Sequence, residues 1–225
     1  MPRHLEIELD RLKEKLLKLS EDVQTLVSQA VLSVGNPEQA DAQMVIDQDF
    51  EIDEKEVEVE EDCLKILALH QPVAIDLRFV IAVLKINNDL ERVGDLAVNI
   101  AERSIFLSKN PPVPFPFDFQ EMSKKAEAML KKSMKSMIEM NSSLAHQVCK
   151  EDDEVDAINR QMYTDVFDGI RKEPKHFESL IQYLLISRHL ERIADYATNI
   201  AEDVIYMVDG TIVRHNPEEY EPILG

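Results

Sequence analysis

The chain has 225 residues, 44% of them hydrophobic and 31% charged, which is enough apolar material for a substantial core. Its 44 Asp and Glu against 25 Lys and Arg give a net charge of −19, which argues against nucleic acid or an anionic membrane as a direct partner. Only five glycines and no tryptophan favour helices over a β-sandwich or barrel. No apolar run approaches the length of about 18 residues that a membrane span needs, so we expect a cytoplasmic protein without direct membrane insertion.

The two cysteines, Cys63 and Cys149, form no CxxC pair and have no nearby histidine at zinc-finger spacing. We therefore expect buried, reduced thiols and not a disulfide scaffold or a structural zinc site.

Helical periodicity dominates the first half of the chain. Leucines at three- and four-residue steps predict a first helix over about residues 5–34, which Gly35-Asn36-Pro37 should end. A second helix follows at about 38–69; Glu and Val alternate within it at 56–60, but the flanking helical period favours helix over strand. Gln71-Pro72 breaks this helix, and a third is predicted over about 73–108.

A proline-rich segment near the middle of the chain, residues 110–117, divides it into two parts of similar composition. The second part repeats the plan of the first, with helices expected at about 119–147, 150–171 and 176–209 and a break at Glu173-Pro174. We therefore predict an all-α protein of two tandem, pseudo-repeated three-helix bundles, residues 1–110 and residues 111–225, the second with a short C-terminal tail.

Internal comparison strengthens this prediction. The segment from Leu90 to Glu102 recurs one hundred residues later, from Leu190 to Glu202, with nine of thirteen positions identical. Upstream, Asp49-Phe50-Glu51-Ile52-Asp53 matches Asp152-Asp153-Glu154-Val155-Asp156. Duplication of a helical unit explains both correspondences.

The repeated acidic positions share one helix face, opposite the apolar stripe. Residues four apart lie about 5–6 Å apart at Cβ, so their oxygens can converge on one cation. Carboxylates and an amide form the hard oxygen set that suits iron, manganese or magnesium. The candidate metal-binding residues are Asp49, Asp53, Glu91, Asp95, Asn99 and Glu102 in the first half, and Asp152, Asp156, Glu191, Asp195, Asn199 and Glu202 in the second.

A solvated surface is the competing interpretation, because any surface helix displays acidic residues opposite its apolar stripe. Two observations weigh against it: the repeat keeps Asp and Asn, which are poor helix formers, and residues 47–62 hold ten acidic residues with Lys55 as the one base. Arg92 and Arg192 lie close enough on the helical wheel to act as partial counterions, so an ion-pair network stays an open alternative.

At these motifs, and at Gln71-Pro72-Val73-Ala74-Ile75-Asp76-Leu77-Arg78, the chain resembles the PhoU family over essentially its whole length. The resemblance implies two similar three-helix bundles and a cytoplasmic negative regulator of phosphate uptake and of the phosphate-starvation response. It further implies an adaptor between the ATPase subunit PstB of the Pst transporter and the sensor kinase PhoR. The resemblance also implies divalent or trivalent metal ions, with iron as the leading candidate and zinc, manganese or magnesium as alternatives. They are implied at the E(D)xxxD motifs: Asp49, Asp53, Glu91, Asp95, Asp152, Asp156, Glu191 and Asp195. The second copy has Ala194 where the first has Gly94, so the two sites need not have the same geometry or metal affinity.

We therefore expect a non-enzymatic signalling adaptor, with a homodimer as a further expectation. One alternative is a carboxylate-bridged di-iron oxidase, but such sites use Glu-x-x-His on two helices, and the only match, Glu173-Pro174-Lys175-His176, falls on a helix break. Another alternative is a helical scaffold without metal.

Overall fold

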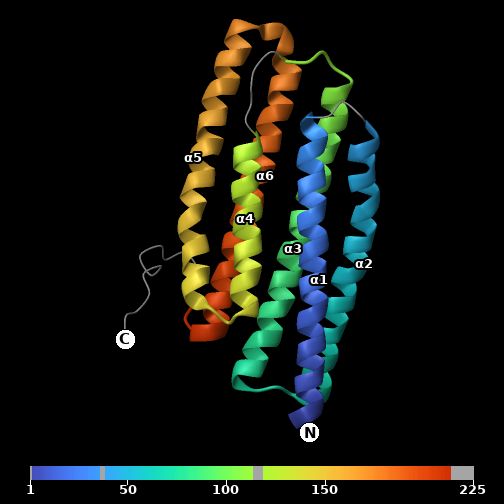
Figure 1. Ribbon diagram of the computed structural model, residues 1–225, viewed down its shortest axis with the longest axis vertical. Coiled ribbons are helices and arrows are strands. Elements are labelled where there is room, and N and C mark those ends of the chain that lie inside the picture. Colours follow the sequence, from blue (N-terminus) through green and yellow to red (C-terminus); the bar gives the residue numbers. More distant parts are fainter. Residues whose placement is uncertain (1, 36–38, 114–118, 214–225) are drawn as a thin grey trace.

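Six long helices make up nearly all of the described chain in this computed structural model, which describes residues 2–35, 39–113 and 119–213 (Figure 1). No strand occurs in those ranges, and the alternating stretch at 56–60 is helical. The helices are α1 (Pro2–Gly35), α2 (Gln39–His70), α3 (Ala74–Ser108), α4 (Phe119–Ile138), α5 (Ser142–Lys172) and α6 (Phe177–Asp209), with a single 3₁₀ turn, η1 (Pro174–His176), before α6.

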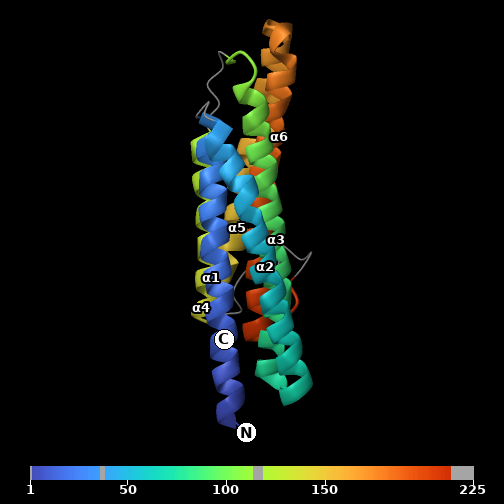
Figure 2. The same cartoon turned by 90° about the vertical axis from the view of Figure 1, so that its right-hand side faces the viewer.

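The helices form two groups of three. Each of α1, α2 and α3 packs against the other two, and the same holds for α4, α5 and α6. The groups join mainly where α3 lies along α6, with α1 beside α4, while α2 and α5 lie on the outer flanks (Figures 1 and 2). The predicted all-α fold of two repeated three-helix units is confirmed.

The breaks between helices agree with the predicted punctuation where the structure describes them. Pro72 separates α2 from α3, and α5 ends at Lys172 directly before Glu173-Pro174. Of the other predicted breaks, Asn36-Pro37 and part of the proline-rich segment lie outside the described residues, as does most of the C-terminal tail.

Two predicted boundaries are wrong: α4 ends at Ile138 and not near residue 147, and α5 begins at Ser142 and not near residue 150. Met140 takes a left-handed backbone conformation with φ of 49°, which few non-glycine residues adopt inside a helix. Asn141 then caps α5, because its side chain accepts a hydrogen bond from the backbone N–H of Leu144 at 3.0 Å. A polar cap inside an otherwise helical pattern therefore sets the turn.

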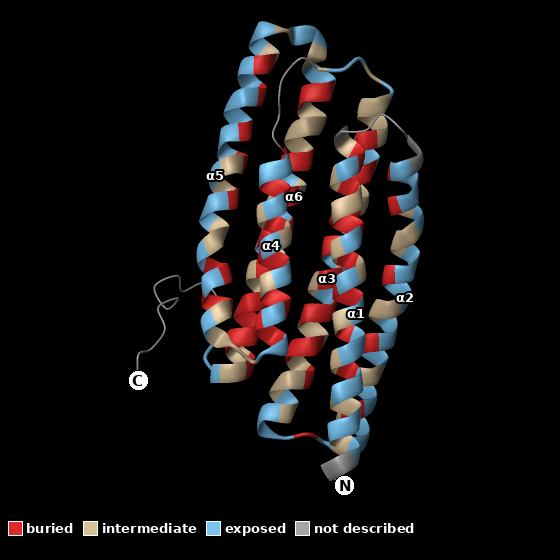
Figure 3. Ribbon diagram, in the orientation of Figure 1, coloured by how far each residue is buried: buried red, intermediate tan, exposed pale blue. Residues whose placement is uncertain are grey.

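The core runs along the inner faces of all six helices (Figure 3). The α3 stripe is fully buried at Ile86, Leu90 and Ile100, and its repeat in α6 is equally buried at Leu190 and Ile200. Removing each such side chain from water stabilises the fold by about 1.5–3 kcal/mol. Burying these stripes turns the acidic positions on the opposite side of the same helices away from the core centre.

The two groups are also joined by polar contacts along α3 and α6. Lys85 Nζ lies 3.1 Å from Asp203 Oδ1, and Arg103 Nη1 donates to Gln182 Oε1 at 3.4 Å. Early α3 thus meets late α6 and late α3 meets early α6, so the two helices are antiparallel.

Both cysteines are free and buried, and burial raises the pKa of each thiol to about 12. This agrees with the expectation of inert, reduced thiols. Within the described ranges, no helix has the length and apolar character needed to cross a membrane.

Candidate functional site

Helices α2 and α3 bring the first set of predicted residues together. We call Asp49, Asp53, Glu91 and Asp95 the first acidic cluster. The contact is close at one point, since a Cβ added at Gly94 would lie 3.2 Å from Asp49 Oδ1. The missing side chain of Gly94 thus lets the Asp49 carboxylate approach α3.

Mutual repulsion follows from this proximity. Burial, and then the negative charges of Asp53, Asp95 and Glu91, together raise the pKa of Asp49 to about 6. The pKa of Glu91 is also raised, mainly by burial and then by Asp95. Carboxylates on two different helices therefore act on one another.

Helices α5 and α6 repeat the arrangement. We call Asp152, Asp156, Glu191 and Asp195 the second acidic cluster. Burial, and then the charges of the other three members and of Asp153, together raise the pKa of Asp152 to about 7. Burial and neighbouring carboxylates also raise the pKa of Glu191 and of Asp195. Thus the structure brings together all eight motif carboxylates, four in each half.

Of the four peripheral candidates, Asn199 is half-buried on α6, and the other three differ in their surroundings. Asn99 donates its amide to the backbone carbonyl of Asp95 at 2.7 Å, and the side chain of Glu102 is 53% exposed beside Arg103. Glu202, its counterpart, is buried on α6 and lies close enough to Cys149 for its charge to raise the pKa of that thiol. The repeat is therefore symmetric in its motif carboxylates and asymmetric around them.

Partial counterions are present, as the ion-pair alternative requires. Arg92 lies 3.5 Å from a carboxylate oxygen of Glu91 and 3.9 Å from one of Asp95, and Arg160 lies 3.2 Å from Asp156. These pairs are long or exposed, and exposed pairs contribute about 0–1 kcal/mol. They leave the raised pKa values of Asp49 and Asp152 in place.

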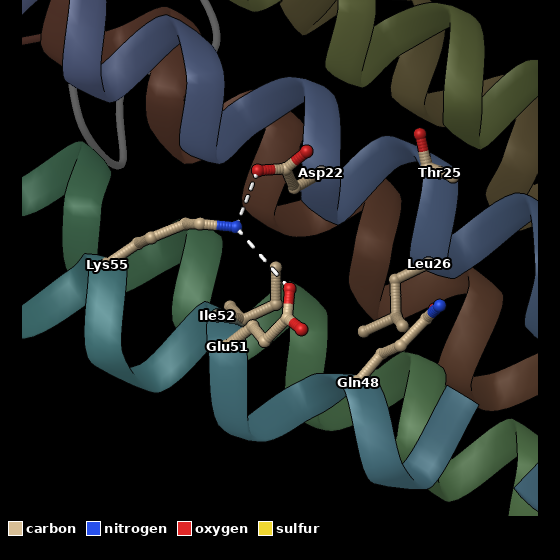
Figure 4. Close-up of a pocket in the computed structure, with 7 residues that line it drawn as sticks. All are labelled: Asp22, Thr25, Leu26, Gln48, Glu51, Ile52 and Lys55. Carbon is tan, nitrogen blue, oxygen red and sulfur yellow. Dashed lines mark hydrogen bonds and ion pairs between the residues drawn. The ribbon is translucent and has the colours of Figure 1, made fainter. Parts of the chain in front are cut away.

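Lys55, the one base among residues 47–62, points away from the first acidic cluster. It lies in a pocket between α1 and α2, where it pairs with Asp22 at 2.9 Å and with Glu51 at 3.9 Å (Figure 4). Lys55 therefore pairs with acidic residues at another face of α2 and does not act as a counterion for the first acidic cluster.

The donor set suits a hard divalent cation. Asp152 Oδ1 is shielded from water and accepts no hydrogen bond, which is costly for a carboxylate unless a cation compensates it. Glu91 Oε2 is also buried without a hydrogen bond, although Arg92 Nε lies 3.5 Å from it. Among the described residues, no three Asp, Glu, His or Cys side chains already stand as a coordination shell, so the carboxylates must turn to bind a cation. Their proximity and repulsion fit that role.

Sequence reasoning missed one pair next to the first acidic cluster. Asn87, buried in α3, donates its amide to Glu56 of α2, to Oε1 at 2.9 Å and to the backbone carbonyl at 3.0 Å. The equivalent pair in the second half is Asn159 and Ser187, joined at 2.7 Å. The sequence did contain a signal for this pair, because residues three or four apart share a helix face. Glu56 lies three residues after Asp53, and Asn87 lies four residues before Glu91.

Comparison with known proteins assigns the family. A family model described as the PhoU domain matches residues 16–104 and again residues 119–204. The chain belongs to the PhoU family. Each PhoU domain match contains one complete acidic cluster.

Relatives and solved structures agree over nearly the whole length. The chain is 36% identical to a phosphate-specific transport system accessory protein PhoU homolog of Aquifex aeolicus, with 92% of this chain and 94% of that relative covered. It is 34% identical to PhoU homolog 1 of Thermotoga maritima, at 92% and 90% coverage. The crystal structure of PhoU from Pseudomonas aeruginosa superposes with a TM-score of 0.88 at 31% identity, over 92% of this chain and 99% of that one.

Proposed function

We propose that the protein is a non-enzymatic negative regulator of phosphate uptake and of the phosphate-starvation response. The observation that carries this proposal is the match of both repeats to the PhoU domain, with a complete acidic cluster in each. Relatives named as accessory proteins of the phosphate-specific transport system support the role in phosphate transport.

The adaptor acts in the cytoplasm between the transporter's ATPase subunit, PstB, and the sensor kinase PhoR. Rigid helices suit this role because they present long, fixed surfaces to two partners at once. With a net charge of −19, basic partner surfaces are favoured over nucleic acid or anionic lipid.

Divalent metal, with iron as the leading candidate, neutralises the two acidic clusters. A bound cation supplies positive charge where carboxylates of two helices repel one another, and so fixes α2 against α3 and α5 against α6. The side chains of Asp49 and Asp152 take part once they release their protons. The metals thereby set the shape of the surface that the partners meet.

Deletion of the gene in its host tests the regulatory role. We expect phosphate-regulated genes to be expressed in phosphate-rich medium after deletion, and repression to return with the wild-type gene. Unchanged repression in the deletion strain would contradict the proposal.

A second test separates the adaptor from the di-iron oxidase and the metal-free scaffold. We expect Asp95→Asn with Asp195→Asn to weaken repression while the protein stays folded. Oxygen consumption by the iron-loaded protein would favour the oxidase, and full repression by the double variant would favour the scaffold.

A further inference from the structure

The polar pair of Glu56 and Asn87 distinguishes the first half of the molecule from the second. The carboxylate of Glu56 is partly buried, and its pKa is raised by burial and by the charges of Glu60, Glu91 and Asp53. No cationic side chain of the described ranges compensates it. Glu56 is thus a fifth carboxylate that belongs electrostatically to the first acidic cluster.

Asn87 adds an oxygen that has no partner. The residue is 1% exposed, and both hydrogen bonds of its Nδ2 go to oxygens of Glu56. Those oxygens are acceptors, so the amide cannot be reversed without placing its carbonyl against them. Oδ1 is consequently held in a fixed direction, buried and without any donor.

Such an oxygen destabilises a helix interface, because a buried acceptor without a partner lowers the stability of the fold by about 1–3 kcal/mol. Asn87 precedes Glu91 by one helical turn. Glu91 Oε2 is buried without a hydrogen bond, although Arg92 Nε lies 3.5 Å from it, and the charge of Glu91 acts on the Glu56 carboxylate of α2. A cation bound here would give Asn87 Oδ1 a partner and would neutralise the carboxylates of Glu56 and Glu91.

The second half carries no carboxylate at the positions equivalent to Glu56 and Asn87. Asn159 replaces Glu56, Ser187 replaces Asn87, and the two side chains satisfy each other, since Ser187 Oγ donates to Asn159 Oδ1 at 2.7 Å. Ser187 is fully buried. The pair is neutral and closed, so it extends the core and not the acidic cluster.

We propose that Glu56 and Asn87 are additional ligands of a divalent cation at the first acidic cluster, and that the second cluster binds the same cation more weakly. This inference rests on the metal binding proposed above. A hard cation such as Mn²⁺ or Fe²⁺ takes carboxylate and amide oxygens together, and each added anionic ligand raises its affinity.

Manganese titration of the full chain tests the proposal, with bound Mn²⁺ followed by electron paramagnetic resonance after chelator treatment. In a background of Asp152→Asn with Asp195→Asn, only the first acidic cluster is intact. We expect Glu56→Gln in that background to weaken Mn²⁺ binding by about tenfold or more. Glu58→Gln is the matched control, because Glu58 is an exposed carboxylate of α2 that pairs with Lys15.

Two further variants separate ligation from folding. Glu56→Asn with Asn87→Ser installs the pair that the second half already accommodates, so we expect a folded protein, judged by circular dichroism, with the same loss of Mn²⁺ affinity. Conversely, Asp49→Asn with Asp95→Asn leaves the second cluster alone, which we expect to bind Mn²⁺ more weakly than the first cluster alone.

The outcomes are distinguishable. If the first cluster binds Mn²⁺ but Glu56→Gln binds it as tightly as Glu58→Gln, the added ligands are refuted and the proposed function stands. Absence of Mn²⁺ and Fe²⁺ binding in every form would overturn both this inference and the metal part of the proposed function.

Discussion

Single carboxyl groups in the two acidic clusters couple protonation to folding. Asp152 keeps its proton in the folded protein up to about pH 7, whereas its ordinary pKa is 3.8. The folded state therefore binds more protons than the unfolded chain between these values, and stability falls as pH rises through this interval. Metal binding opposes the loss because it needs the deprotonated form.

We expect Asp152→Asn to stabilise the metal-free protein at pH 8 and to flatten the dependence of its melting temperature on pH between about 4 and 7. The amide keeps the shape of the carboxyl group and removes the buried charge. Thermal unfolding in chelator at several pH values measures the effect. Asp168→Asn, at an exposed residue of the same helix that pairs with Arg171, should leave the profile unchanged.

Gly94 is the residue that lets the Asp49 carboxylate reach α3. An alanine Cβ there would lie 3.2 Å from Asp49 Oδ1 and 3.4 Å from Ile52 Cγ2, so the carboxylate must shift. We expect Gly94→Ala to weaken metal binding at the first acidic cluster in a Mn²⁺ titration.

Helix stability should not suffer from the same change, since alanine is favoured over glycine in a helix by about 1 kcal/mol. Ala194→Gly is the matched variant in the second repeat, and should lower stability without weakening its site. Equal Mn²⁺ affinity of Gly94→Ala and wild type would contradict the role given to this close approach.

At the scale of elements, the α4–α5 turn depends on one cap. We expect Asn141→Ala to lower the free energy of unfolding by about 1 kcal/mol, because the N–H of Leu144 loses its acceptor. Urea denaturation measures this loss. Ser143→Ala, at an exposed neighbour in the first turn, is the control, and an equal effect of both variants would refute the capping role.

The sequence was most informative where a signal lies within one element. Apolar periodicity and Pro72 and Pro174 located most helix boundaries, and the repeat of Glu91 and Asp95 indicated a face that meets a neighbouring helix. The end of α4 was missed because Asn141 interrupts a continuous apolar period. The pair of Glu56 and Asn87 was missed because the register between α2 and α3 is set by packing, which no single-helix pattern contains.

At the scale of the whole molecule, the two halves share an interface along α3 and α6. Asp203 is 2% exposed there, and Lys85, which pairs with it, also lies 5.7 Å from the centre of the Tyr206 ring. Arg78 donates to the backbone carbonyl of Met207 at 3.1 Å near the same end. These contacts tie the repeats into one body, although each repeat carries its own acidic cluster.

We expect Lys85→Met to lower the free energy of unfolding by about 1–3 kcal/mol, because it leaves the buried Asp203 carboxylate without this cation. Urea denaturation followed by circular dichroism measures the loss. Lys18→Met, which removes an exposed pair with Asp22, should cost about 1 kcal/mol or less. Equal effects of the two variants would contradict the importance of the interface pair.

At the scale of the whole molecule, the central claim is that the two acidic clusters hold divalent metal, which neutralises part of the net charge of −19. The measurement is the metal content of the full chain, purified without chelator and then loaded anaerobically with iron or manganese. We predict at least one ion for each acidic cluster, and loss from one cluster alone in Asp95→Asn or in Asp195→Asn. Less than one ion per chain, unchanged by loading, would contradict the account.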